Sequence, residues 1–193
     1  LGGMRVVRGI EAAPDSDFVR RNFYKCALAL GDALLIAYRR FTTPYGGRDL
    51  LLDRLMRDSE EVAPLQLGAL YREALQFKFC PDEAPDVPMD DALLHALAER
   101  WGLVFLHVER LRTGRGWPSL SAYARWRGLR EPDEHAPGKW LRNLIRNSQL
   151  KVWSWRYPRE RLYRQLPVLL EMTENADWPA DTARFLATWE RFS

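Results

Sequence analysis

The chain has 193 residues, of which 47% are hydrophobic and 28% charged, and its formal net charge is +3. This length allows one substantial domain, or a domain with a small helical appendage, that buries its core without disulfides or metal ions. Charged residues such as Asp32, Arg39 and Glu99 interrupt the longest apolar runs, so none reaches the roughly 18 to 20 apolar residues of a membrane span. We therefore expect no membrane partner and no membrane crossing.

Two features of the chain bear on its cellular setting. The cysteines, Cys26 and Cys80, have no metal-ligand spacing, and we interpret them as free thiols of a reducing compartment, which predicts a cytoplasmic protein. The first residues, Leu1-Gly2-Gly3-Met4, resemble neither an ordinary initiator nor a signal peptide. We expect either a processed fragment or a start at Met4 behind leader residues.

Helical spacing dominates the first half of the chain. From Asp15 to Phe41 the apolar residues recur at three and four positions, which is typical of an amphipathic helix, and the Pro- and Gly-containing segment 42–47 should end it. A short helix is predicted over Arg48–Arg57. A third helix should have Pro64 in its first turn and should stop at Cys80-Pro81, because proline disfavours helix in the residue before it.

The second half continues the same pattern with more interruptions. Apolar spacing predicts a long helix over Asp90–Leu111, a short helix capped by Ser119, and a helix through Trp140–Leu150. A further apolar stripe follows Pro158, and a terminal helix is predicted from Asp181. No segment has a convincing alternation of apolar and polar residues, which would indicate a strand.

These patterns predict an all-α fold, a compact multi-helix bundle with five to seven helices. Residues 1–113 should form the main bundle, and residues 114–193 a basic, aromatic-rich helical subdomain that packs on it as one domain. The expected core contains the stripes of 15–41 and 90–111.

Catalytic and metal-binding patterns are weak. Among the histidines His95, His107 and His135, only His95 has a carboxylate, Glu99, four residues further along the same helix. His95 and His107 point in different directions on an ideal helix, so they do not converge on one metal ion, and no third ligand is evident. There is no serine elbow, phosphate-binding loop, dinucleotide-binding glycine pattern or zinc knuckle. We predict no cofactor, no metal site and no catalytic residue in this chain.

Gly31-Asp32 lies within the long apolar helix, where either residue weakens intrinsic helicity. The glycine would allow two helices to cross closely. The aspartate would either face water or anchor a neighbouring helix. We favour a packing role, because a lone carboxylate defines no reaction.

Basic residues are concentrated in one segment. Residues 110–164 hold 14 Arg and Lys against 4 Asp and Glu, with eight Trp and Tyr among them. Arginine binds phosphate through paired N–H groups, and flat rings stack on bases. Arg142 and Arg146 should face water on the side away from Leu141, Leu144 and Ile145. The predicted nucleic-acid or phosphate-binding residues are Arg142, Arg146, Trp117, Arg125, Arg127, Lys151 and Arg156.

The alternative for this segment is structural. The tryptophans would then be core residues, and the arginines would cover them with their apolar stems. The chain has 25 arginines and only four lysines, so a general preference for arginine would enrich any local cluster.

The segment Tyr24–Ala37, followed by Tyr38, Phe41 and Tyr45, resembles the first helix of helical domains that follow a nucleotidyltransferase domain, including HEPN-like bundles. The resemblance covers residues 18–57. It implies a helical domain that helps to bind a nucleotide or polymer, while a catalytic domain with a glycine-serine loop and paired metal-binding aspartates lies upstream. This chain contains no such loop.

HEPN-like ribonucleases carry an arginine followed by a polar residue and, a few residues later, a catalytic histidine. Arg142-Asn143 and Arg146-Asn147 resemble the start of that pattern, but residues 149–153 contain no histidine.

We therefore predict a non-catalytic helical accessory or interaction domain, as the C-terminal part of a nucleotidyltransferase-like protein. Enzymatic activity would require an upstream catalytic domain. The alternative is a nucleic-acid or polyanion-binding module that uses residues 110–164. The expected partners are a nucleic acid or nucleotide, an upstream catalytic domain, and a second copy of the chain.

Overall fold

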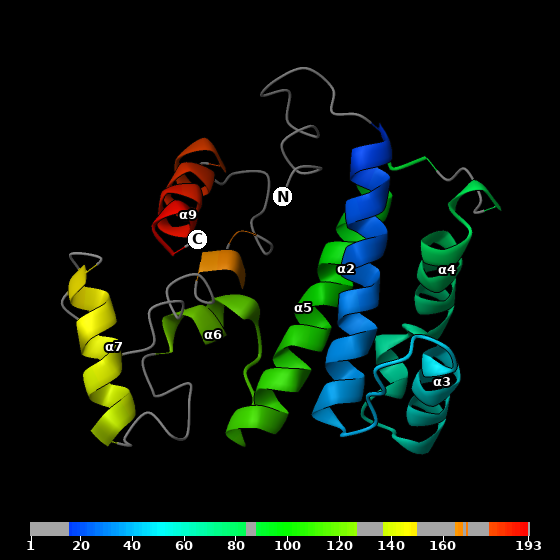
Figure 1. The fold of residues 1–193 in the computed structure, drawn as a ribbon, viewed down its shortest axis with the longest axis horizontal. Helices are drawn as coiled ribbons and strands as arrows, with labels where there is room; N and C mark the ends of the chain where they lie inside the picture. Colours follow the sequence, from blue (N-terminus) through cyan, green and yellow to red (C-terminus); the bar gives the residue numbers. More distant parts are fainter. Residues whose placement is uncertain are drawn as a thin grey trace. The chain divides into compact units, whose positions relative to one another are not determined.

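The computed structural model describes residues 16–83, 88–126, 137–149, 165–167, 169 and 178–192. Every regular element in these residues is a helix, which confirms the predicted all-α class. In chain order they are α2 (Ser16–Ala37), α3 (Arg48–Asp58), η1 (Ala63–Leu65), α4 (Gly68–Phe79), η2 (Pro81–Glu83), α5 (Asp91–Thr113), α6 (Leu120–Arg125), α7 (Pro137–Gln149) and α9 (Trp178–Phe192) (Figure 1). None of the helices in these ranges is long and apolar enough to cross a membrane.

The chain divides into two units, an N-terminal unit of Leu1–Val108 and a C-terminal unit of Glu109–Ser193. This boundary falls inside α5, whereas the predicted division lies at the end of that helix.

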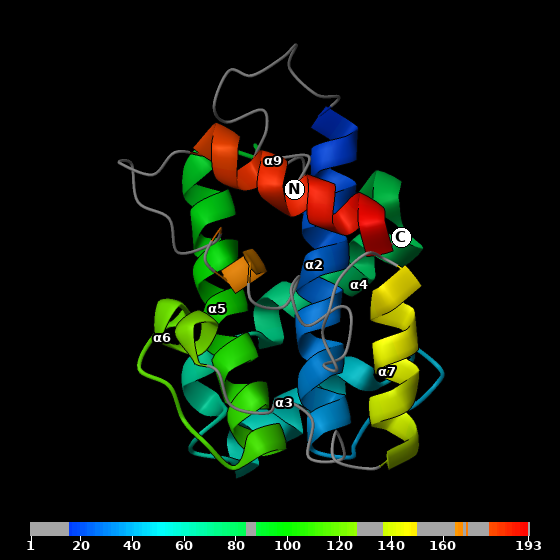
Figure 2. The ribbon, with the colours of Figure 1, turned by 90° about the vertical axis from the view of Figure 1, so that its left-hand side faces the viewer.

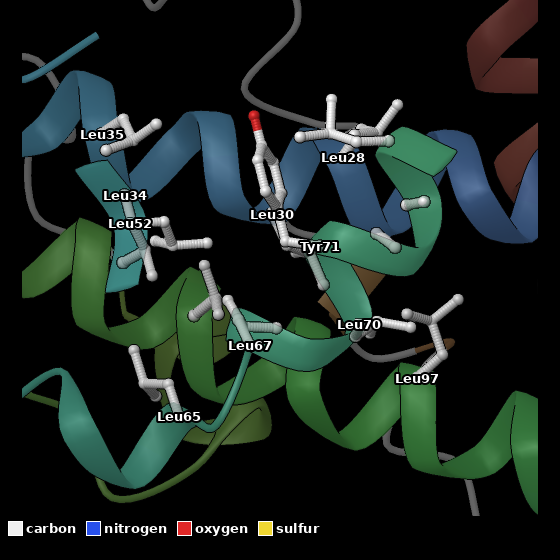
Figure 3. Close-up of a cluster of buried hydrophobic side chains, with 14 of the residues drawn as sticks. Leu28, Leu30, Leu34, Leu35, Leu52, Leu65, Leu67, Leu70, Tyr71 and Leu97 are labelled. Atoms are coloured by element: carbon white, nitrogen blue, oxygen red, sulfur yellow. The ribbon is translucent and has the colours of Figure 1, made fainter. Parts of the chain in front are cut away.

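Leucine side chains from α2, α3, α4 and α5 form the core of the N-terminal unit, as Figure 3 shows. Figures 1 and 2 show α2 beside both α4 and α5. The fully buried members include Leu34, Leu35, Leu52 and Leu67. The stripes predicted within 15–41 and 90–111 both contribute to this core, because the 3.6-residue period of a helix places their apolar residues on one face.

The first long helix ends earlier than predicted, at Ala37 instead of Phe41. Arg39 adopts a left-handed conformation with φ 57°, and the backbone N–H of Arg40 donates to the carbonyl of Leu35 at 2.7 Å. The N–H of Arg39 donates to the carbonyl of Ile36. This is the Schellman arrangement, which satisfies the last carbonyls and turns the chain before the expected proline and glycines.

Pro64 also lies outside the helix to which it was assigned. It belongs to the short 3-10 turn η1, and Gln66 then takes a left-handed conformation with φ 49°, so that α4 begins only at Gly68. Arg39 and Gln66 thus set the end of α2 and the start of α4. Left-handed conformations are uncommon in residues other than glycine, so the sequence did not indicate them.

In the C-terminal unit, Ser119 caps α6 as predicted. Its side-chain oxygen accepts a hydrogen bond from the backbone N–H of Ala122 at 3.1 Å, which satisfies a free amide of the first turn. A small core forms around Leu169 and Phe185, with Leu166 and Leu186 packed against them.

Candidate polyanion-binding surface

Helix α7, yellow in Figure 1, contains Arg142 and Arg146, two of the predicted phosphate-binding residues. Arg142 and Arg146 lie four residues apart and therefore share one face of the helix. Both side chains are exposed, and neither forms an ion pair with an acidic residue in the part of the chain that the structure describes. This pair is available to an external anion.

Two of the apolar residues of α7, Leu141 and Ile145, are not buried as predicted. Leu141 and Ile145 are 51% and 50% exposed, whereas Asn143 and Asn147 are only 6% and 2% exposed. The expectation that the arginines would lie on the side away from a packed stripe of Leu141, Leu144 and Ile145 is therefore wrong for Leu141 and Ile145, whereas Leu144 is half-buried. The helix turns its two asparagines inward, and this rotation brings the apolar pair to the surface beside the arginines.

Trp117 does not form an open stacking platform. It is half-buried, with its ring edge-on to Tyr123 at 5.0 Å between centroids and tilted against Trp126 at 5.2 Å. Tyr123 itself is only 1% exposed. These contacts favour the structural alternative for Trp117, in which the ring packs within the protein.

A buried carboxylate organises the same region. Glu109 Oε2 accepts a hydrogen bond from the Tyr123 hydroxyl at 2.8 Å, and Arg112 donates to both oxygens of Glu109 at 2.9 and 2.7 Å. A bidentate pair of this kind has matched geometry on both sides. Arg112 is therefore committed to an internal contact, although it belongs to the basic segment.

The remaining predicted site residues differ in position. Arg125 is exposed at the end of α6, and the guanidinium of Arg115 lies 5.6 Å from the ring centroid of Trp126. Arg127, Lys151 and Arg156 lie outside the described residues. Within the described residues, α7 thus supplies two of the predicted arginines on one face of a helix.

The N-terminal unit contains a second polar cluster, around Asp32 of α2. Its carboxylate accepts hydrogen bonds from Arg48 Nη1 at 3.2 and 3.0 Å and from the Tyr71 hydroxyl at 2.6 Å. Burial and the hydrogen bond to Asp32 raise the pKa of Tyr71. Asp32 therefore anchors α3 and α4 to α2. Of the two roles predicted for it, facing water or anchoring a neighbouring helix, the structure has the second.

Arg48 is 3% exposed, and its donors are used within the protein. Nε donates to the carbonyls of Thr42 and Pro44 at 2.7 and 3.1 Å, and Nη2 donates to the carbonyl of Thr43 at 2.6 Å. Its guanidinium lies 4.1 Å from the ring centroids of both Phe41 and Tyr45. These contacts fold the 41–47 loop around Arg48 and engage its guanidinium within the protein.

Sequence reasoning singled out Asp32 but missed its partners. Arg48 and Tyr71 lie 16 and 39 positions away in the chain, so no local spacing connects them. The sequence did indicate that a partner must exist, because Asp32 is a carboxylate in an apolar helix and a buried charge requires a partner.

The two histidines of the N-terminal unit, His95 and His107, have different partners. His95 Nδ1 lies 2.8 Å from the carbonyl of Asp91, and His107 Nε2 lies 3.0 Å from the Tyr38 hydroxyl. Among the residues that the structure describes, no group of three or more His, Cys, Asp or Glu side chains could hold a metal ion.

We compared the chain with protein-family models, with curated proteins and with solved structures, and none of them matches it.

Proposed function

We propose that this protein is a non-catalytic interaction module whose basic segment binds a polyanion, with nucleic acid as the ligand. The observation that carries the proposal is the exposed pair Arg142 and Arg146 on one face of α7. Two guanidinium groups one helical turn apart can contact successive phosphates, because each presents N–H donors that match phosphate oxygens.

The charge around the pair supports the same ligand. Residues 137–149 contain three basic residues and no acidic one, and the wider segment 110–164 has 14 basic residues against 4 acidic ones. Such a regional excess attracts a polyanion from solution and orients it before contact. Arg125, exposed on α6, adds to this charge.

The polar cluster around Asp32 supports a scaffold role for the N-terminal unit. Arg48 and Tyr71 both donate hydrogen bonds to Asp32, and other Arg48 donors are engaged by backbone carbonyls. A cluster with this pattern holds three helices and a loop together. The buried polar groups are therefore explained by packing.

The resemblance of residues 18–57 to helical domains beside nucleotidyltransferases supports a related proposal, an accessory domain of a nucleotidyltransferase-like protein in the cytoplasm. In that setting the bound polyanion would be a substrate of an upstream catalytic domain. The reading frame upstream of Leu1 tests this: a glycine-serine loop followed by paired aspartates would support it. A short leader would instead favour an independent module.

The binding proposal is tested by fluorescence anisotropy with labelled single-stranded RNA and DNA at two salt concentrations. We expect binding at low salt that weakens steeply as salt rises, because phosphate contacts release counterions. The double variant Arg142→Ala/Arg146→Ala should bind several-fold more weakly with every sequence. The matched control is Arg54→Ala/Arg57→Ala, which removes two exposed arginines from α3 of the N-terminal unit. Equal losses in both double variants, or no binding at low salt, would contradict the proposal.

A further inference from the structure

Helix α7 exposes two aliphatic side chains and buries two polar ones. Its described side chains include two half-exposed aliphatic residues, Leu141 and Ile145, and two buried amides, Asn143 and Asn147. Single exposed leucines are common on protein surfaces. An adjacent aliphatic pair at the surface of a helix that buries its asparagines is a more specific feature, because the two amides lie inward while Leu141 and Ile145 stay in contact with water and Leu144 is half-buried.

The aliphatic pair lies next to the arginine pair. Each residue of a helix is rotated by about 100° from the one before it, so the row Leu141–Ile145 is followed around the helix by the row Arg142–Arg146. All four side chains are exposed. The surface therefore offers an apolar row and a cationic row side by side, and we call these four residues the α7 face.

Charge limits what can cover the α7 face. A second copy of α7 would bring arginines against arginines, because residues 137–149 contain no acidic residue to pair with them. The occupant must instead carry negative charge beside apolar surface. A nucleic-acid duplex keeps the faces of its bases stacked inside, so it would offer Leu141 and Ile145 only base edges, such as the thymine methyl group, in its grooves.

A single strand has both properties, because its unstacked bases are free to contact side chains beside the phosphates. We propose that the α7 face binds single-stranded nucleic acid, with Arg142 and Arg146 on the phosphates and Leu141 and Ile145 against the bases. This inference rests on the proposed function. It also assigns the base contacts to Leu141 and Ile145, in place of the packed ring of Trp117.

The experiment compares a labelled single strand with a duplex of equal length, using the full chain and anisotropy at low salt. If charge alone governed binding, the duplex would bind at least as tightly, since its charge density is higher. We expect the single strand to bind more tightly. The variant Leu141→Gln/Ile145→Gln keeps helix propensity and should lower single-strand affinity by about tenfold while leaving duplex affinity almost unchanged.

The matched control is Ile36→Gln/Leu50→Gln, an exposed Ile and an exposed Leu on helices of the N-terminal unit, at 59% and 68% exposure. It should bind both ligands like the parent protein. Circular dichroism melting of each variant verifies folding, which substitutions at half-exposed positions should preserve.

The outcomes separate this inference from the proposed function. Equal or tighter duplex binding that is insensitive to Leu141→Gln/Ile145→Gln would overturn the inference and leave polyanion binding intact. If neither the single strand nor the duplex binds, both the inference and the proposed function are contradicted. Vesicles of phosphatidylglycerol form a third arm, with phosphatidylcholine as reference. Loss of vesicle binding in Leu141→Gln/Ile145→Gln, with single-strand affinity unchanged, would assign the apolar pair to a membrane surface and overturn the inference.

Discussion

Gly31 of α2 lies against the ring of Tyr71 of α4 so closely that a Cβ atom at position 31 would overlap Cδ2 and Cε2 of the ring. The ring cannot easily move away, because Tyr71 is fully buried and its hydroxyl donates to Asp32. Gly31 and Asp32 thus act together: the glycine makes room for Tyr71, and the aspartate holds it.

We predict that Gly31→Ala destabilises the protein, by about 1 to 3 kcal/mol in the free energy of unfolding, because the added methyl overpacks the helix crossing. In an exposed helix the same change would be stabilising, since alanine has the higher helix propensity. Gly138→Ala in α7, where a Cβ would meet nothing within 4 Å, is the control and should be neutral or stabilising. Urea unfolding of the two variants measures the difference, and equal effects would contradict this account of Gly31.

Removal of the Asp32 carboxylate should be strongly destabilising. Asp32→Ala leaves Arg48, 3% exposed, without its anion, and the loss of one partner of a buried pair costs about 3 to 5 kcal/mol. Asp58→Ala removes the partner of Arg40 at a surface pair with side-chain exposures of 37% and 51%, and should cost at most about 1 kcal/mol. Chemical denaturation compares them. A loss in Asp32→Ala no larger than in Asp58→Ala would show that the cluster does not anchor α3 and α4.

Stability should fall in alkaline solution through Tyr24. Burial, and then the hydrogen bond to Glu73, raise the pKa of Tyr24 from 10.0 to about 12. Below pH 10 the folded and unfolded chains both keep this proton, so the contribution is complete. As the pH rises from 10 through 12, the unfolded chain releases the proton first and the contribution is lost.

The variant Tyr24→Phe keeps the ring but has no proton to release. We therefore expect the gap in unfolding free energy between the parent protein and Tyr24→Phe to be constant near neutral pH and to shrink between pH 10 and 12. Urea titrations at a series of pH values measure it. A gap that stays constant over this range would show that Tyr24 titrates alike in both states.

Trp117→Ala should affect stability more than binding. The ring packs against Tyr123 and Trp126, so its removal should lower the unfolding free energy by about 2 to 4 kcal/mol and leave single-strand affinity nearly unchanged. Trp189, 51% exposed on α9, is the control, and Trp189→Ala should cost less. Thermal melting and anisotropy together decide the role of Trp117. A large affinity loss with an unchanged melting temperature would restore Trp117 as a stacking residue.

Local patterns predicted much of this fold. The apolar stripes of 15–41 and 90–111 identified two core helices, because helical periodicity is a property of neighbouring residues. Ser119 was identified as a cap for the same reason, since its oxygen contacts an amide only three positions away. The ends at Ala37 and Gly68 were missed, since they depend on the left-handed residues Arg39 and Gln66, which no side-chain pattern marks.

The sites depended on information that the sequence alone does not contain. Asp32 was visible as a charge in an apolar helix, but its partners Arg48 and Tyr71 come from distant positions and meet it only when three helices pack. In α7, amphipathic spacing determined that Arg142 and Arg146 share a face. Which face turns outward was decided by the tertiary structure, because the burial of Asn143 and Asn147 depends on the neighbours of the helix, and helical periodicity alone does not specify those neighbours.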